Sequence, residues 1–181
     1  FMIPAAAPPH KKTAAVTNAS DRLKMLELAV SGQSGIKISD IELRRPGPSY
    51  TIDTIGYFKK TRSPDSKIYL ILGLDAFLEI DTWKSFEALF KSIQIVVMSR
   101  PSAQYPDAAG YEQQIKSYLH ATISSDYHYS QERGCFMHTF YQPVIPFAVS
   151  PLDISATQIR NRIKDNQSIQ PLVPESVVAY I

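Results

Sequence analysis

Residues 68–73 read Ile-Tyr-Leu-Ile-Leu-Gly, an unbroken apolar run that ends in glycine. A short run of this kind is typical of a strand buried on both faces of a sheet. Residues 93–99, Ile-Gln-Ile-Val-Val-Met-Ser, repeat the pattern after a helical stretch around residues 83–90. Short buried strands that alternate with helices indicate an α/β fold, in which a parallel sheet carries helices on both faces.

The remaining elements follow from periodicity and from helix and turn signals. Residues 36–43 alternate apolar and polar side chains, which predicts a strand with one open face. Residues 124–134 are polar and predict a loop, whereas residues 136–149 predict a strand broken by two prolines. Helices are expected over residues 20–31 with Ser20 as N-cap, over residues 50–60 and 111–119, from Ser155 onward, and over residues 174–181.

Composition sets the broad class of the protein. The chain has 181 residues, 44% hydrophobic and 20% charged, which suits one globular domain with a sizeable core. A net charge of +2 gives no general electrostatic reason to bind nucleic acid. The single cysteine, Cys135, excludes a disulfide within the chain. No apolar run approaches the roughly 18 residues of a membrane span. The N-terminal charge order does not suit a signal peptide, so a cytoplasmic location is predicted.

Basic residues follow two of the expected strands. His10 and Lys11 come after the apolar residues 1–4 and a proline-rich loop, and Arg100 follows residues 93–99. Ligands of parallel α/β sheets bind at the carboxyl ends of the strands, so these side chains are candidates for anion contacts. On their own they fit a solvated basic loop equally well, and Arg100 alone decides nothing.

The residues after 68–73 form a second candidate region. Asp75 follows the strand and Gly73, and a carboxylate in this position can accept both hydroxyls of a ribose. Trp83, the only tryptophan of the chain, lies a few residues further on. Taken alone, an aromatic side chain on a helical face is more often part of the core than a platform for a ligand.

Residues 152–160, Leu-Asp-Ile-Ser-Ala-Thr-Gln-Ile-Arg, predict an anion site at a helix start. Ser155 and Gln158 fit a capping box, which explains both without any ligand. Thr157 and Arg160 are three residues apart and therefore share a helix face. The free N–H groups and positive dipole of a helix start, combined with a hydroxyl and a guanidinium, favour phosphate groups. The segment therefore predicts a seat for the phosphates of a nucleotide.

Longer segments extend this pattern along the chain, in the order PPHK, DRLKMLELA, SDIELRRPGPSYTIDT, LGLDAFLEIDTWKSFE, VVMSRP, LDISATQIRNRI and LVPESVVAYI. Together they resemble the bacterial nicotinate-mononucleotide adenylyltransferases of the nucleotidyltransferase superfamily. The resemblance covers nearly the whole chain and is weakest from about residue 102 to 145. The SxTxIR pattern is shared across the superfamily, whereas GPSYTIDT followed by GLDAF and TW is narrower and favours the nicotinate enzymes.

The resemblance implies a Rossmann-like, doubly wound parallel sheet of the nucleotidyltransferase type. It also implies transfer of the adenylyl group of ATP to nicotinate mononucleotide, which gives nicotinate adenine dinucleotide and pyrophosphate in NAD biosynthesis. By similarity, ATP is held by His10, Gly73, Asp75, Ile154, Ser155, Thr157 and Arg160. The mononucleotide is held by Lys11, Tyr50, Thr51, Trp83 and Arg100, with Trp83 stacked on the pyridine ring.

The implied chemistry needs no nucleophilic side chain, because one phosphate attacks another in line and alignment with charge neutralisation suffices. Mg²⁺ is expected to arrive on the ATP phosphates rather than in a protein cage. His120, His128 and His138 are therefore expected to be structural or surface residues. The expected partners are ATP and nicotinate mononucleotide, without nucleic acid or membrane, and homo-oligomer formation is left open.

Members of the resembled family open with a strand and a G-x-F-x-P-x-H-x-G-H loop whose histidines bind the ATP phosphates. Residues 1–181 hold no such segment. We therefore expect one nucleotidyltransferase domain over residues 1–181 that is incomplete at its N-terminus, lacks its first central strand and contains no catalytic residue. An incomplete sequence, a strand lent by another chain and a rearranged sheet are all left open. We expect these 181 residues by themselves to lack adenylyl transfer.

Three other functions remain open on sequence grounds. A sister adenylyltransferase would act on nicotinamide mononucleotide or phosphopantetheine, and the choice between acid and amide is not fixed by the sequence. A catalytically inactive fragment would bind nucleotide without turnover, as the lack of the histidine loop suggests. A nucleic-acid binder is the least favoured, because tyrosines and basic residues do not alternate along one surface.

Overall fold

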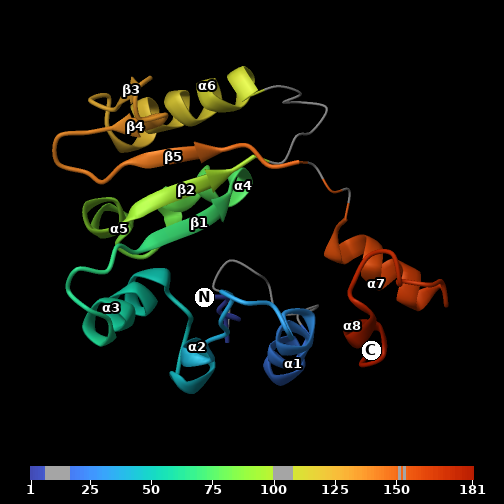
Figure 1. Ribbon diagram of the computed structural model, residues 1–181. Helices are drawn as coiled ribbons and strands as arrows, with labels where there is room; N and C mark the ends of the chain where they lie inside the picture. Colours follow the sequence, from blue (N-terminus) through green and yellow to red (C-terminus); the bar gives the residue numbers. More distant parts are fainter. Residues whose placement is uncertain (7–16, 100–107, 151, 153) are drawn as a thin grey trace. The chain divides into compact units, whose positions relative to one another are not determined.

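A five-stranded sheet in the order β1-β2-β5-β4-β3 organises the middle of the chain (Figure 1). The computed structural model describes residues 1–6, 17–99, 108–150, 152 and 154–181. The chain divides into a sheet unit, Thr51–Pro151, and a terminal unit that combines Phe1–Tyr50 with Leu152–Ile181. Within the described residues, no helix is both long enough and apolar enough to cross a lipid bilayer.

Three parallel strands form one half of the sheet: β1 (Tyr69–Gly73), β2 (Gln94–Met98) and β5 (Val144–Phe147). The other half is antiparallel, with β4 (Cys135–Met137) beside β5 and β3 (His128–Ser130) at the edge. The predicted α/β class is therefore confirmed, and β1 and β2 lie where the apolar runs predicted them. The sheet is mixed rather than wholly parallel because a hairpin extends it.

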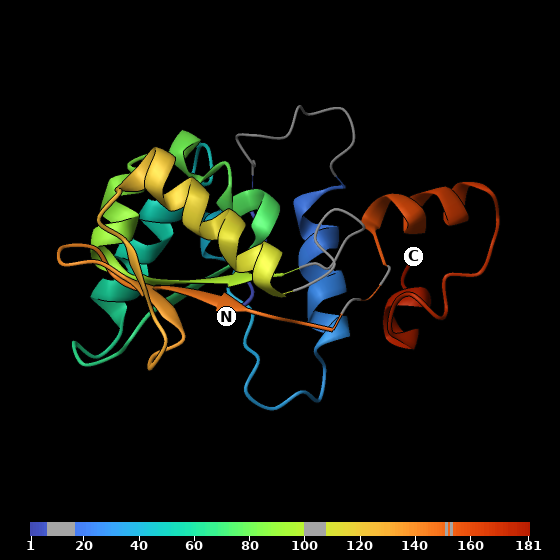
Figure 2. The same cartoon turned by 90° about the horizontal axis from the view of Figure 1, so that it is seen from above.

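Helical segments connect the parallel strands, as crossover connections require. Between β1 and β2 lie α4 (Leu74–Phe77), the 3₁₀ turn η2 (Ile80–Thr82) and α5 (Phe86–Ser92). Between β2 and β5 lie α6 (Ala108–Tyr118), the π-helical turn η3 (Leu119–Ile123) and the β3–β4 hairpin. The helix α3 (Thr51–Thr61) precedes β1. Figure 2 shows α4, α5 and α6 on the same side of the sheet.

The core of the sheet unit lies between those helices and one face of the strands. Leu72, Ile95, Val97 and Val144 are the buried residues of β1, β2 and β5. Phe77, Leu89, Phe90, Ile115 and Leu119 bury their side chains in the same cluster. Full burial of each such side chain stabilises the fold by about 1.5–3 kcal/mol. The alternate residues of β1 point the other way, so Ile71 is 59% exposed.

The loop predicted over residues 124–134 was wrong at its centre, because His128–Ser130 forms β3. Tyr127 is buried and the ring of Tyr129 meets Phe136 edge-on at 5.0 Å, so alternate aromatic side chains face inward. The turn closes through a hydrogen bond from the Gly134 N–H to the Ser130 carbonyl, with Gly134 at a φ of 60° that favours glycine. The tyrosine alternation was the signal, and the polar residues between masked it.

The described residues of the terminal unit form four helices: α1 (Ala19–Ala29), α2 (Ile41–Arg44), α7 (Ala156–Lys164) and α8 (Glu175–Val178). Two hydrogen bonds join its first and last parts. The Ser176 hydroxyl donates to the Leu28 carbonyl at 3.0 Å, and the Tyr180 hydroxyl donates to the Asp21 carboxylate at 3.1 Å. These bonds fix α8 against α1.

The strand predicted over residues 36–43 was also wrong in large part. Only Ile38 pairs in a β-bridge, with Met2, and the chain then turns into α2. Asp40 causes the change: its carbonyl accepts from the N–H groups of Leu43 and Arg44, and its carboxylate pairs with the Arg44 side chain at 2.8 Å. The first helix starts slightly earlier than predicted, because Asn18 rather than Ser20 provides the capping side chain.

Candidate nucleotide-binding site

The carboxyl end of β1 carries the first pair of predicted site residues. Gly73 ends the strand in an extended conformation and leads directly into α4. The buried side chains of Leu74 and Phe77 anchor this turn to the core, whereas Asp75 is exposed in the first turn of α4. A Cβ atom built on Gly73 would meet no other atom within 4 Å. The backbone here therefore faces open space, and a ligand can approach it closely.

Trp83 lies at the end of η2, where the backbone returns to an extended conformation. Its side chain is half-buried and packs against the core cluster, so the indole serves the fold as well as any ligand. The turn before it is held by a 2.6 Å hydrogen bond from the Tyr118 hydroxyl to the Asp81 carboxylate. Burial, reinforced by that carboxylate, raises the pKa of Tyr118 well above its usual range, so the hydroxyl keeps its proton.

Thr51 is the first residue of α3, as the predicted contact with a carboxylate requires. The first N–H groups of a helix have no partner within the helix, and they point toward its positive dipole end. Asp53 in the first turn of α3 pairs with Lys84, whose ammonium lies 3.2 Å from the carboxylate. Lys84 follows Trp83 directly, so this ion pair ties the start of α3 to the indole-bearing loop.

The start of α7 has the capped geometry that the sequence predicted. Ser155 is the N-cap in an extended conformation, and its hydroxyl accepts from the Gln158 N–H at 3.1 Å. Thr157 and Arg160 are exposed, and Ile154 before the cap is half-buried. The first turn of α7 carries no acidic residue. Its hydroxyl, guanidinium and N–H groups are therefore suited to an anion.

The predicted site residues are distributed over both units. Thr51, Gly73, Asp75 and Trp83 belong to the sheet unit, and Tyr50, Ile154, Ser155, Thr157 and Arg160 belong to the terminal unit. Within the sheet unit, the Asp53–Lys84 ion pair ties the start of α3 to the residue that follows Trp83. The predicted contacts of His10, Lys11 and Arg100 lie outside the described residues.

Sequence reasoning missed the contacts on either side of Trp83, which involve Asp53, Lys84, Asp81 and Tyr118. Each pair is far apart in the sequence, by 31 and 37 positions, so no local spacing reveals it. The only signal available was that Asp53 and Lys84, of opposite charge, are near Thr51 and Trp83. The opposite charges of Asp53 and Lys84 predict an ion pair only after Thr51 and Trp83 have been assigned to the same ligand.

No group of three or more histidine, cysteine, aspartate or glutamate side chains in the described part of the chain could hold a metal ion. Two of the three histidines expected to be structural make hydrogen bonds inside the sheet unit. His120 bonds the Tyr127 carbonyl at 2.7 Å, and His138 bonds the Ser124 hydroxyl at 3.0 Å. His128 is exposed on β3.

Comparisons with known proteins fit these elements to a family. The sequence profile of the cytidylyltransferase-like family matches residues 1–162. A probable nicotinate-nucleotide adenylyltransferase from Desulfatibacillum aliphaticivorans is 40% identical over 99% of this chain and 81% of that protein. The chain belongs to the nicotinate-nucleotide adenylyltransferase family. A member from Pseudomonas fluorescens is 38% identical over 99% of this chain and 78% of its own length. The family predicted from the sequence motifs is thus confirmed.

Solved structures agree on the fold. Plasmodium falciparum nicotinic acid mononucleotide adenylyltransferase complexed with NaAD aligns with a TM-score of 0.64 over 99% of this chain and 77% of that one. The same enzyme complexed with APC gives a TM-score of 0.59. The sequence identities are 16% and 17%, so these likenesses concern the fold alone. The mixed α/β sheet of this family member is consistent with the Rossmann-like nucleotidyltransferase fold.

Proposed function

We propose that this protein transfers the adenylyl group of ATP to nicotinate mononucleotide, giving nicotinate adenine dinucleotide and pyrophosphate in NAD biosynthesis. The observation that carries the proposal is the 40% identity over 99% of the chain to a probable nicotinate-nucleotide adenylyltransferase. The capped start of α7, with exposed Thr157 and Arg160, supports a role in phosphate binding. The open backbone at Gly73 supports nucleotide binding at the carboxyl end of β1.

ATP is the first substrate in this proposal, and its phosphates lie at the start of α7. The N–H groups beyond Ser155, the Thr157 hydroxyl and the Arg160 guanidinium hold the triphosphate, and Ile154 lines the approach. Such donors are charge-assisted and aimed at the phosphates before the reaction begins. Asp75 accepts the ribose hydroxyls beside Gly73, and His10 adds a further phosphate contact.

Nicotinate mononucleotide is the second substrate. Trp83 stacks on the pyridine ring, and the backbone N–H groups of Tyr50 and Thr51 receive the ring carboxylate. Lys11 and Arg100 neutralise the mononucleotide phosphate. A carboxylate facing two N–H donors is favoured over a carboxamide, which would present its own N–H group to one of them.

The reaction is an in-line attack of the mononucleotide phosphate on the α-phosphorus of ATP. A phosphorus–oxygen bond forms to the attacking oxygen while the bond to pyrophosphate breaks, so no covalent enzyme intermediate arises. Alignment of the two phosphates and neutralisation of the leaving group supply the rate enhancement. Mg²⁺ enters as part of the ATP substrate and offsets charge on its phosphates.

A substrate panel tests the proposal. Pyrophosphate release is measured with Mg-ATP and, in separate reactions, with nicotinate mononucleotide, nicotinamide mononucleotide and phosphopantetheine. Binding of each acceptor is followed through the emission of Trp83, the only tryptophan. We expect nicotinate mononucleotide to bind most tightly and to be the preferred acceptor in whatever pyrophosphate release is measured. A preference for nicotinamide mononucleotide or for phosphopantetheine would show that the proposed second substrate is wrong. If ATP and nicotinate mononucleotide bind but no pyrophosphate is released, the chain is a catalytically inactive nucleotide-binding fragment.

A further inference from the structure

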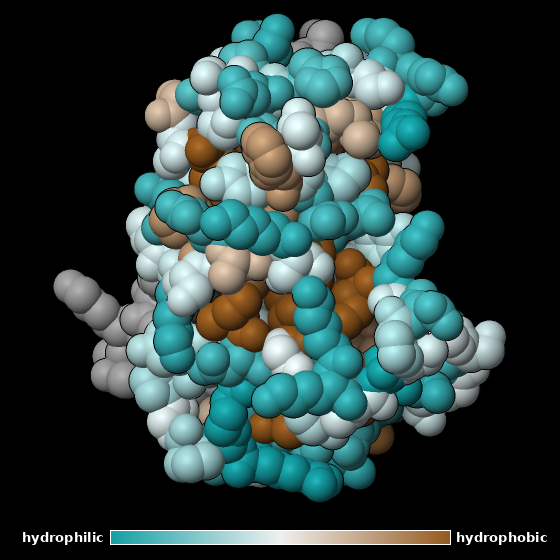
Figure 3. Space-filling view, turned by 90° about the vertical axis from the view of Figure 1, so that its left-hand side faces the viewer, coloured by the Kyte–Doolittle hydropathy of each residue, from teal (hydrophilic) through white to brown (hydrophobic). Residues whose placement is uncertain are grey.

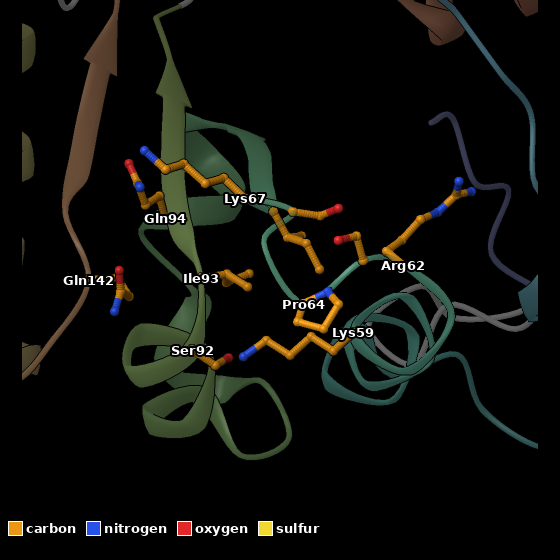
Figure 4. Close-up of a pocket in the computed structure, with 11 residues that line it drawn as sticks. Lys59, Arg62, Pro64, Lys67, Ser92, Ile93, Gln94 and Gln142 are labelled. Carbon is orange, nitrogen blue, oxygen red and sulfur yellow. The ribbon is translucent and has the colours of Figure 1, made fainter.

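A pocket of about 360 Å³ opens in the sheet unit, and none of the residues assigned to the nucleotide site lines it (Figure 4). It is formed by the last turn of α3, the segment that leads into β1, the end of α5 and the start of β2. Its volume lies near the lower limit for pockets that hold small molecules, roughly 300–1,000 Å³. Figure 3 shows apolar surface among hydrophilic side chains on the left-hand side of the view in Figure 1.

The pocket lies at the amino ends of β1 and β2, opposite the strand end that carries Gly73. Ile68, directly before β1, and Gln94, the first residue of β2, both line it. Gly73 and Asp75 stand at the other end of β1, which spans five residues. At about 3.3 Å per residue, the five steps from Ile68 to Gly73 span roughly 16 Å. A ligand in this pocket therefore binds separately from a nucleotide at Gly73 and Asp75.

The charged residues that line the pocket are all basic: Lys59, Arg62 and Lys67. Arg62 points away from the other two in Figure 4, and its guanidinium lies 5.8 Å from the ring centre of Phe58. Lys59 and Lys67 take part in none of the ion pairs formed among the described residues. No carboxylate in the described part of the chain therefore lies within ion-pairing distance of either ammonium.

Lys59 also lies in the last turn of α3, where a cation is favourable for the helix dipole. That role is shared with Lys60 in the same turn. The C-terminal end of a helix carries about half a negative elementary charge, whereas the ammonium groups of Lys59 and Lys60 together carry two positive charges. The helix dipole therefore balances only part of the positive charge at the end of α3.

A neutral hydrogen-bonding residue, Gln142, also lines the pocket, and hydrogen bonds fix its backbone. Gln142 donates its N–H to the Phe90 carbonyl at 2.7 Å, and its own carbonyl accepts from the Tyr127 hydroxyl at 3.0 Å. Both backbone groups of Gln142 are thus fixed, which leaves its side-chain amide at the pocket. Because the backbone of Gln142 is already ordered, a ligand bound to its side chain has less to order.

The side chains of Lys59 and Lys67 place their ammonium groups at opposite ends of the pocket. In Figure 4, Lys59 extends toward Ser92, Lys67 extends toward Gln94, and the apolar side chain of Ile93 lies between them. Each end of the pocket therefore offers one ammonium with a neutral polar neighbour, and the middle is apolar. We propose that this pocket binds a small dianion, with two carboxylate or phosphate groups joined by a short apolar linker. The proposal does not depend on the adenylyltransferase function.

The probe is adipate, a six-carbon dicarboxylate. The control ligand is hexanoate, which has the same chain length but only one carboxylate. Binding to the purified protein at low ionic strength is followed by the side-chain amide signals of Gln94 and Gln142 in two-dimensional NMR. We expect adipate to shift both signals saturably and hexanoate to bind about tenfold more weakly, a difference of about 1.4 kcal/mol. Added salt should weaken adipate binding, because the contacts are exposed ion pairs.

The double variant K59Q/K67Q should weaken adipate binding by about tenfold or more. The double variant K24Q/K116Q removes the same charge at lysines that do not line the pocket, and should leave adipate binding unchanged. Circular dichroism confirms that both variants fold. Equal loss in the two variants, equal binding of adipate and hexanoate, or no saturable shift would each overturn the proposal. If inorganic phosphate binds as well as adipate, the site recognises a single anion and the two-ended assignment is wrong.

Discussion

Lys84 and Asp53, 31 positions apart in the chain, form an ion pair in which the ammonium lies 3.2 Å from the carboxylate. Asp53 belongs to the first turn of α3, and Lys84 directly follows Trp83. The pair therefore joins the helix that begins at Thr51 to the loop that carries the indole. In the proposed reaction, these two elements form two walls of the pyridine site.

Lys84→Gln removes the cation of this pair and leaves Asp53 to serve the dipole of α3. Both side chains are partly exposed, so the pair is worth about 0.2–1 kcal/mol. We expect KM for nicotinate mononucleotide to rise about two- to fivefold, with kcat and KM for ATP almost unchanged. The emission of Trp83 should move to longer wavelength as the loop loosens. Steady-state kinetics and tryptophan fluorescence measure both effects.

The matched control is Lys91→Gln, which breaks the exposed pair between Lys91 and Glu87 on α5, at 3.9 Å. It should change neither KM nor emission. Lys84→Arg keeps the charge and should restore most of the affinity. An equal rise of KM in the Lys84 and Lys91 variants, or no rescue by arginine, would show that the pair does not position the indole.

Trp83→Leu separates the two roles of the indole. Trp83 is half-buried against the core cluster, so leucine retains apolar packing but removes the aromatic face. Stacking contributes about 0.5–1.5 kcal/mol beyond burial, so binding of nicotinate mononucleotide should weaken about three- to tenfold. Trp83→Phe keeps an aromatic ring and should bind nearly as well as the parent. Isothermal titration gives the affinities, and equal binding by the two variants would assign Trp83 to the core alone.

Local signals in the sequence were sufficient for the start of α7 and for β1 and β2. The cap at Ser155 depends on residues three positions apart, and the apolar runs of the parallel strands need no knowledge of the rest of the chain. The candidate site residues came from the family motifs, because a motif identifies residues that meet in the folded protein even where their spacing does not show it.

The errors occurred where a distant or competing contact decides the structure. Residues 36–43 alternate like a strand, yet Asp40 captures the N–H groups that a strand would leave for pairing. Tyr127 and Tyr129 face inward with His128 between them, and pairing with β4, where Tyr129 packs on Phe136, makes the segment a strand. The Asp53–Lys84 pair had no local counterpart at all. A local helix-start contact therefore decided residues 36–43, whereas contacts with other segments decided β3 and the ion pair.

Arg160→Ala tests the phosphate site at the start of α7. Arg160 is exposed, so the free energy of unfolding should change by no more than about 0.5 kcal/mol. Loss of charge-assisted hydrogen bonds to phosphate, worth about 1.5–3 kcal/mol, should raise KM for ATP by at least about tenfold. Lys164→Ala, in the last turn of the same helix, removes an equal charge and should have little effect. Similar kinetics for both variants would place the ATP phosphates elsewhere.

Tyr127 should make the protein sensitive to alkaline pH. Its ring is 1% exposed, its hydroxyl donates to the Gln142 carbonyl, and burial raises its pKa well above the usual value near 10. The unfolded chain therefore loses this proton first, so the stabilisation is complete below about pH 10 and falls as pH rises, by up to about 1.4 kcal/mol per pH unit.

Tyr127→Phe removes both the hydrogen bond and the ionisable group. Below pH 10 the variant should be less stable by about 0.5–1.5 kcal/mol, because one hydrogen bond is lost and the Gln142 carbonyl loses a partner. Above pH 10 its unfolding free energy should decline less steeply than that of the parent, so the difference narrows. Urea unfolding across this range measures the slopes, with Tyr57→Phe at an exposed ring as the control. Parallel curves for the parent and Tyr127→Phe would mean that Tyr127 ionises alike in the folded and unfolded chains.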